Sequence, residues 1–150
     1  MTSSNAPDAL TKFHRTPWKF QQTFKTPLKN LLPFVTITIS AIQPFKSGQL
    51  TIETWVFEPK HLKAVLSSHS ISAECQRGQC VTAVSEDEAA QLLEAALNDW
   101  VDFIFIPNPK SFAIYAHHDE STTFFAHTRS GLNRVTGALV AAGFEPITRH

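Results

Sequence analysis

The segment 85–100 constrains the fold more than any other stretch, because it carries both a helix start and a continuous apolar face. Ser85 and Glu88 form an S-x-x-E capping box, in which each side chain accepts a hydrogen bond from a free backbone N–H at a helix start. Apolar residues then recur at helical spacing, which predicts an amphipathic helix over residues 86–100 that packs one face on a core. That face consists of Ala89, Leu92, Leu93, Ala96, Leu97 and Trp100.

Other segments alternate apolar and polar residues at the two-residue period of a β-strand. The run 34–42, FVTITISAI, alternates β-branched residues, and the run 49–58 follows it after a turn, so we expect these two strands to form a hairpin. Residues 102–109 and the two halves of segment 110–128 are expected to be further strands. In the hairpin 110–128, Phe124 and Phe125 should point to opposite faces of the sheet and both be buried.

Two cysteines flank another expected hairpin, which would turn at Arg77 and Gly78. This arrangement would place Cys75 opposite Cys80, close enough for a disulfide. The N-terminus carries no pattern of a secretory signal, however, so we expect a cytoplasmic protein with both thiols reduced. The C-x4-C spacing lacks a second Cys or His pair and does not indicate a zinc site.

Two more helices complete the expected order of elements. Pro59 suits a helix start and precedes apolar residues at helical spacing, and a last helix is expected over 130–142. Gly143 suits the left-handed position just past that helix, before a short final strand at 144–147. Strands and helices in this order predict an α+β fold, in which two to three helices pack on one side of a mainly antiparallel sheet.

The N-terminal region shows little periodicity. Residues 1–11 are rich in Ser, Asn, Pro and Asp and are expected to form a disordered tail, whereas 12–150 should form a single domain. Residues 12–32 mix bases with aromatic side chains, which predicts an irregular, basic arm with a short helix near 27–32.

The charges are unevenly distributed although they sum to zero over the chain. Residues 9–52 carry six Lys or Arg and no acid, while residues 53–102 carry nine acids and three bases. Such asymmetry indicates either a charged partner or contact between the two regions, within the fold or across a homodimer. The neutral total argues against a dedicated nucleic-acid protein, and no apolar run is long enough to cross a membrane.

The stretch His117-His118-Asp119-Glu120 raises the question of a metal or acid/base site. Adjacent strand residues point to opposite faces, so His117 and His118 could not share an ion on a regular strand. With a four-residue loop, His127 would lie about 16 Å from His117 along the ladder. We therefore interpret the stretch first as a turn, second as a polar recognition loop and third as a catalytic or metal site. No metal or other cofactor is expected.

The same register makes both faces of the 110–128 hairpin largely apolar, whereas an antiparallel sheet usually keeps one face polar. The hairpin should therefore lie between two layers or be covered by a partner. One face would carry Ala113, Tyr115, Phe124 and Ala126, and the other Phe112, Ile114, Ala116, Thr123 and Phe125.

These features favour a small protein-binding module, such as an immunity- or antitoxin-like inhibitor that blocks a basic partner protein. One alternative is a metal-dependent or acid/base enzyme that uses the 117–120 loop. Another is nucleic-acid binding through the basic aromatic segment 12–46, because bases and aromatic residues alternate on single-strand binding surfaces. The expected binding residues are His117, His118, Asp119, Glu120, Tyr115, Trp55, Glu86 and Asp87.

Overall fold

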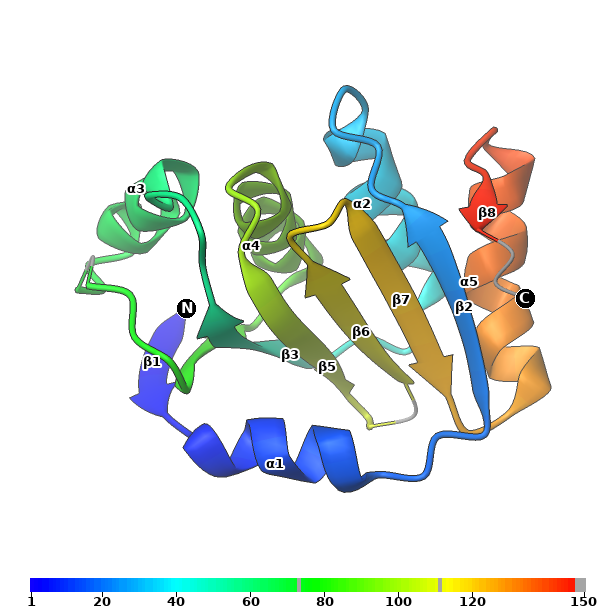
Figure 1. Ribbon diagram of the computed structural model, residues 1–150, viewed down its shortest axis with the longest axis horizontal. Helices are drawn as coiled ribbons and strands as arrows, with labels where there is room; N and C mark the ends of the chain where they lie inside the picture. Colours follow the sequence, from blue (N-terminus) through cyan, green and yellow to red (C-terminus); the bar gives the residue numbers. More distant parts are fainter. Residues whose placement is uncertain (73, 111, 148–150) are drawn as a thin grey trace.

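An eight-stranded antiparallel sheet in the order β1-β4-β3-β5-β6-β7-β2-β8 organises the computed structural model, which describes residues 1–72, 74–110 and 112–147 (Figure 1). The strands are β1 (Thr2–Asn5), β2 (Phe20–Lys25), β3 (Ser47–Thr54), β4 (Gln79–Ala83), β5 (Asp102–Asn108), β6 (Phe112–His117), β7 (Ser121–Ala126) and β8 (Pro146–Ile147). The helices are α1 (Pro7–Arg15), α2 (Leu31–Ala41), α3 (Lys60–Ser68), α4 (Glu86–Asn98) and α5 (Arg129–Ala141). The expected α+β fold is confirmed, with five helices among the described residues rather than two to three.

The main core lies between one face of the sheet and helices α2 to α5, and α2 and α4 are seen behind the sheet in Figure 1. Phe103 and Phe105 of β5 point into this core, whereas Ile104 between them points to the other face. There it packs with Ala113 against Phe13 of α1. The helices therefore cover both faces of the sheet, which corrects the expectation that they pack on one side. No helix in the described part of the chain has the length and apolar character needed to span a membrane.

The run 34–42 forms most of helix α2, so the prediction of a strand there, and of a hairpin with 49–58, is wrong. The sequence alternates apolar and Thr residues, but it also places apolar residues at helical spacing. Phe34, Val35 and Ile39 are buried on one face of α2, and the Thr38 hydroxyl donates a hydrogen bond of 2.8 Å to the Phe34 carbonyl. Burial against α4 and α5 thus outweighs the modest preference of β-branched residues for strands.

The N-terminal region contains more regular structure than its composition suggested. Strand β1 pairs with β4 at the edge of the sheet, and α1 follows it directly. The segment expected to be a disordered tail, 1–11, therefore comprises β1 and the first half of α1. The segment 12–32, expected to be irregular, comprises the rest of α1, strand β2 and the start of α2.

The two cysteines do not face each other across a hairpin. Strand β4 begins directly after Arg77 and Gly78, and it pairs with β1 and β3 rather than with the residues that precede the turn. Cys80 lies opposite Ser4 on one side and Thr51 on the other, and both cysteines are free thiols. The expected hairpin is therefore wrong because the partner strands come from distant segments.

Three predicted helices are confirmed. Helix α3 begins after Pro59, α4 begins after Ser85, and α5 begins after Thr128, whose hydroxyl accepts a hydrogen bond from Gly131 N–H. The end of α5 also follows the prediction, because Gly143 adopts a φ of 97° just past the helix. The N–H groups of Gly143 and Phe144 bond back to the last turn of α5, which satisfies its free carbonyls.

The start of α4 shows the predicted cap in detail. The Ser85 hydroxyl accepts a hydrogen bond of 3.1 Å from Glu88 N–H, and the Glu88 carboxylate accepts one of 3.0 Å from Val84 N–H. The carboxylate thus reaches one residue further back than in a standard capping box. Replacing Ser85 with alanine should lower the free energy of unfolding by about 0.5–2 kcal/mol, because one N–H at the helix start loses its partner. Chemical denaturation measures this, and an unchanged stability would contradict the role of Ser85.

The 110–128 hairpin forms, but its register differs by one residue from the prediction. His117 pairs with Ser121, and Phe112 pairs with Ala126, so the loop has three residues instead of four. Glu120 ends this loop with a φ of 67°, which is typical of three-residue hairpin loops. A shift of one residue moves each side chain of β7 to the other face relative to β6, so the two predicted sets of neighbours are wrong.

Candidate functional site

Three loops meet at one end of the central strands of the sheet, and we call this region the loop edge. It consists of residues 55–59 after β3, residues 99–101 before β5, and residues 118–120 between β6 and β7. The pairing of Thr54 with Asp102, and of Phe103 with Ala116, brings the three loops together. They lie at the upper edge of the sheet in Figure 1. Loops carried at one end of a rigid scaffold are common binding sites.

A buried carboxylate at the loop edge holds two histidines. Asp102, the first residue of β5, has only 3% of its surface exposed, and its Oδ1 accepts a hydrogen bond of 2.7 Å from His118 N–H. The His118 Nδ1 atom lies 3.0 and 3.1 Å from the two carboxylate oxygens. His117 Nε2 lies 3.9 Å from Asp102 Oδ2, and the two imidazole rings stack with centroids 4.3 Å apart. Both histidines therefore lie beside one carboxylate.

This arrangement departs from the sequence argument, which placed His117 and His118 on opposite faces. Strand β6 ends at His117, so His118 belongs to the turn. The alternation of side chains between the two faces of a strand therefore does not determine where the His118 side chain points. The third member of the cluster, Asp102, comes from the neighbouring strand β5. The sequence offered one signal for it, since Asp102 begins a predicted strand, but only the pairing of β5 with β6 places it beside the histidines.

Asp119 organises the turn. Its Oδ1 accepts hydrogen bonds from both the hydroxyl and the N–H of Ser121, and it lies 3.1 Å from His117 Nδ1. The Ser121 hydroxyl and the adjacent His117 hold the pKa of the Asp119 carboxyl below its usual value. The stretch is therefore a turn, as first interpreted. Its polar tip reaches solvent, since Asp119 is exposed and Glu120 is half-buried.

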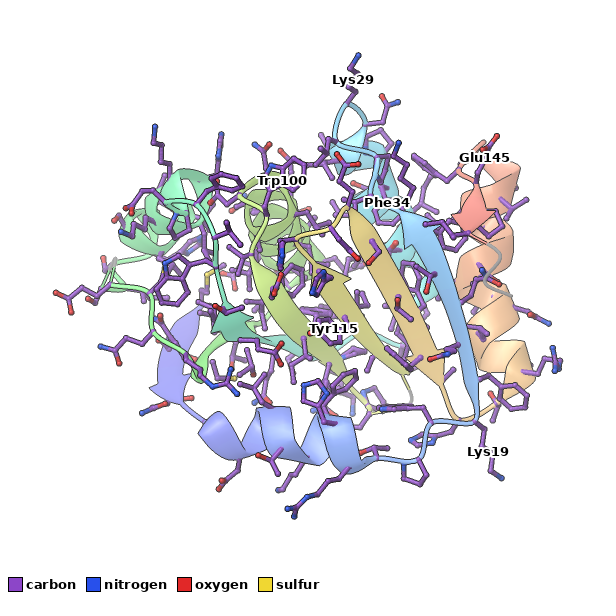
Figure 2. The ribbon with its side chains drawn as sticks, viewed as in Figure 1. Lys19, Lys29, Phe34, Trp100, Tyr115 and Glu145 are labelled. Atoms are coloured by element: carbon purple, nitrogen blue, oxygen red, sulfur yellow. The ribbon has the colours of Figure 1, made fainter. Side chains whose placement is uncertain are left out.

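A second polar network lies next to the cluster. The Tyr115 hydroxyl donates a hydrogen bond of 2.7 Å to Glu53 Oε1, and His14 Nε2 of helix α1 lies 2.8 Å from Glu53 Oε2. Burial favours the neutral form of Glu53, but the contacts with His14 and Tyr115 outweigh it and lower the pKa of this carboxyl. Burial and the Glu53 carboxylate raise the pKa of Tyr115, which therefore acts as a hydrogen-bond donor. Figure 2 shows Tyr115 on the sheet face between α1 and the loop edge.

A bulge in the β3–β5 pairing sets the position of Glu53. The register shifts between Ile52 and Thr54, which leaves Glu53 as the extra residue of β3. Bulges re-aim side chains at the ends of strands and are common beside functional sites. Glu53 was expected only as one of the acids of residues 53–102 that could meet a basic partner, and the sequence did not predict its contacts with His14 and Tyr115.

The loop after β3 exposes three consecutive large apolar side chains. The exposed fractions are 37% for Trp55, 56% for Val56 and 59% for Phe57. Phe57 packs edge-on against half-buried Trp100, with ring centroids 6.4 Å apart. Trp100, labelled at the loop edge in Figure 2, was predicted to complete the apolar face of the helix, but α4 ends at Asn98 and Trp100 follows it with a φ of 62°, so that part of the prediction is wrong. Trp55 was expected to be a binding residue, whereas Val56 and Phe57 were missed.

Two of the expected binding residues lie elsewhere. Glu86 and Asp87 occupy the first turn of α4, on the core side of the sheet, and Glu86 accepts a hydrogen bond from the Gln43 amide. Helix α4 has 13 residues, so they lie about 20 Å from its C-terminal end, where the loop edge begins. The structure therefore separates these two acids from Trp55, Tyr115 and the 117–120 turn, which lie close together.

The second apolar face of the hairpin is covered by the chain itself. Phe13 of α1 packs edge-on against Tyr115 and Phe125, with centroids 5.7 and 5.3 Å away. Phe124 points to the main core and Phe125 to α1, which confirms that the two rings lie on opposite faces, with Phe124 buried and Phe125 half-buried. The hairpin therefore lies between two layers of the same chain, which was one of the two expectations from the sequence. Its second face is not left open for a partner.

Much of the basic aromatic segment 12–46 also serves packing. Phe13, Phe24 and Phe34 are buried, and Trp18 stacks on His127 with centroids 4.4 Å apart. These rings are engaged with other side chains, which reduces the aromatic surface on which bases could stack.

A broad cleft adjoins the turn on the side away from α1. It has a volume of about 740 Å³ and is lined in part by Lys25, Lys29, Glu120 and Glu145. The charges of its walls have both signs, and its mouth is wide. The cleft does not include the histidines, so the polar cluster and the cleft are separate features on the two sides of Glu120.

These observations define a small α+β domain in which two histidines, a buried carboxylate and exposed aromatic side chains lie at one end of the central strands of an antiparallel sheet. Comparison with known proteins gives no match to a family model, to a curated protein or to a solved structure.

Proposed function

We propose that this protein is a small protein-binding module that docks its loop edge on a partner protein. The observation that carries the proposal is the exposed run of Trp55, Val56 and Phe57. A folded chain gains free energy by burying such side chains, roughly 1.5–3 kcal/mol for each one that is fully removed from water. Three in succession on one loop are a candidate for the apolar centre of an interface.

The surroundings of this loop support the same proposal. Central aromatic anchors with a polar rim are typical of protein interfaces, in which a few residues supply most of the affinity. Here Trp55 and Phe57 are the anchors, and the half-buried Trp100 ring packs against Phe57. Exposed Asp119 and half-buried Glu120 lie on the neighbouring loop and would contribute the acidic part of the rim.

The acidic rim indicates the chemistry of the partner. A basic patch beside an apolar pocket would complement Asp119, Glu120 and the anchors, because opposed charges speed encounter and orient the two surfaces. A small domain of this kind can block a partner's active site by covering it, as immunity proteins and antitoxins do. Tyr115 is not proposed as an anchor, since its hydroxyl is engaged by Glu53.

Affinity capture with the full-length chain tests this proposal. The wild type, a Trp55→Ala/Phe57→Ala double variant and a Leu32→Ala control would each be used as bait in lysate of the native host, and retained proteins quantified by mass spectrometry. Leu32 is a matched control because it is 57% exposed and lies on α2. We expect one partner to be retained by the wild type and the control, and to be reduced at least about tenfold with the double variant, since interface anchors contribute about 2 kcal/mol or more each.

Titration calorimetry with the purified partner would then give the change in affinity directly. The double variant should remain folded, because neither substituted side chain belongs to the buried core, and thermal melting would verify this. If every retained protein binds all three baits equally, or if the bait retains none, the proposed role of the loop edge is wrong.

A further inference from the structure

We infer that Asp102, His117 and His118 form a binding site for a divalent transition-metal ion of the zinc type. One ligand atom from each residue can be chosen so that all three lie within 4.8 Å of one another. This is the one such group of three or more histidine, cysteine or carboxylate side chains among residues 1–72, 74–110 and 112–147. The inference is independent of the proposed docking surface, because it concerns an ion and not a protein partner.

The separations fit a shared ion. Ligand atoms about 2.0–2.2 Å from a zinc ion lie roughly 3.0–3.5 Å from each other in octahedral or tetrahedral arrangements. The distances from His118 Nδ1 to the Asp102 oxygens are 3.0 and 3.1 Å, and His117 Nε2 is 3.9 Å from Asp102 Oδ2. The third separation, between the two histidine nitrogens, is at most 4.8 Å, and a rotation of the partly exposed His117 ring would bring its nitrogen closer to a shared ion.

The surroundings hold two of the ligands in position. Asp102 is buried, and its carboxylate is fixed by the His118 backbone N–H, so it is held on the strand end rather than on a mobile loop. Asp119 lies 3.1 Å from His117 Nδ1, and a carboxylate on one ring nitrogen leaves the other nitrogen free to bind a metal. The Asp119 N–H also approaches His117 Nδ1, at 3.3 Å, but the shorter contact with the charged carboxylate favours a proton on Nδ1.

The ligand set indicates the class of ion and of site. Two imidazoles and one carboxylate suit zinc and neighbouring transition metals, whereas magnesium and calcium prefer oxygen ligands alone. The side chains of His117 and His118 are 39% and 41% exposed, so an ion bound there would face solvent. Three protein ligands with an open position are typical of zinc sites that bind an additional small ligand, not of closed structural sites.

A second histidine–aspartate pair provides an internal comparison. His61 Nδ1 lies 2.7 Å from Asp99 Oδ1, and Asp99 is also buried. This pair is not part of any group of three candidate ligands within the described residues. It should therefore bind zinc far more weakly than the cluster at Asp102, although its chemistry is similar.

Calorimetric titration of chelator-treated full-length protein with Zn²⁺ tests the inference. We expect one ion per chain, with an affinity reduced more than about 100-fold in His118→Ala and about 10–100-fold in Asp119→Asn, the usual range for residues that orient a metal ligand. His61→Ala should leave the affinity unchanged. Co²⁺ in place of Zn²⁺ should give a spectrum without the intense thiolate charge-transfer bands that would report binding by Cys75 or Cys80.

Far-ultraviolet circular dichroism and thermal melting would verify that each variant is folded. His117→Ala is the second ligand variant, since its side chain is partly exposed and its loss leaves no buried charge. The inference is overturned if the wild type takes up no zinc, or if His118→Ala and His117→Ala bind it as tightly as the wild type. It is also overturned if His61→Ala reduces the affinity as much as His118→Ala does.

Discussion

Replacing Phe124 with alanine is expected to lower the free energy of unfolding by about 3–5 kcal/mol, the usual cost of removing a fully buried phenylalanine ring. Phe124 is fully buried at the centre of an aromatic cluster in the main core. Its ring centroid lies 5.6 Å from that of Phe24, 5.8 Å from Phe112 and 6.0 Å from Phe34. The truncation would leave a cavity among three rings that come from three different elements, so the site has little freedom to collapse.

Phe125→Ala is the matched comparison, because it removes the same ring from the next position on the other face. Phe125 is half-buried under α1, so the loss should be smaller, about 1–3 kcal/mol. Urea denaturation of both variants measures the two losses. Equal losses would contradict the placement of Phe124 in the main core and of Phe125 beneath a single helix.

The second large effect is expected at Asp99, at the end of α4. Its buried carboxylate accepts hydrogen bonds of 2.7 Å from Leu62 N–H and 3.2 Å from His61 N–H. It therefore caps the start of α3, although the two segments are more than 35 residues apart in the sequence. Asp99→Ala removes a charged acceptor and leaves two N–H groups at the helix start without it. The expected loss is about 3 kcal/mol, in the range for hydrogen bonds to charged groups.

Asp99→Asn keeps one oxygen acceptor of nearly the same shape, so it should cost less than the alanine variant. Denaturation curves of the two variants, together with hydrogen exchange at the amides of α3, measure the effect. A loss below about 1 kcal/mol in Asp99→Ala, or unchanged exchange at Leu62, would show that water replaces the carboxylate and that the cap adds little.

Short-range signals in the sequence predict the structure best at the helix ends and along the apolar face of α4. The Ser85–Glu88 cap, the apolar face of α4 and Gly143 after α5 each act within one or two helical turns, and all three are confirmed. Helix capping and helical periodicity depend on neighbours that are close in the sequence, so the sequence alone contains the required information.

The segment 34–42 shows where local signals conflict. Its residues fit a two-residue period and a helical period at once, and β-branched residues favoured the strand. Tertiary contacts decide that the segment is helical. As helix α2 it buries Phe34, Val35 and Ile39 between α4, α5 and the sheet. The free energy of that burial exceeds the difference in local preference, which is below 1 kcal/mol per residue.

The candidate site was predicted in part. The sequence singled out His117 through Glu120, Tyr115 and Trp55, and these residues lie at or beside the loop edge. It did not predict that Asp102 lies beside the two histidines or that Glu53 binds Tyr115. The first contact joins β5 to the turn that follows its neighbour β6, and the second joins β3 to β6 across the intervening strand β5, so each depends on how the strands are ordered and aligned in the sheet.

The sequence by itself determined the helices with strong caps, the α+β class and the position of the polar turn, because these depend on local hydrogen bonds and periodicity. Tertiary structure alone decided the helical state of α2, the register of the β6–β7 hairpin and the use of α1 to cover its second face. Each of these depends on which apolar surfaces meet, and a one-residue change of register reverses every side chain of a strand. The histidine–carboxylate cluster depends on a second register, that of β5 with β6, which aligns Asp102 with the start of the turn.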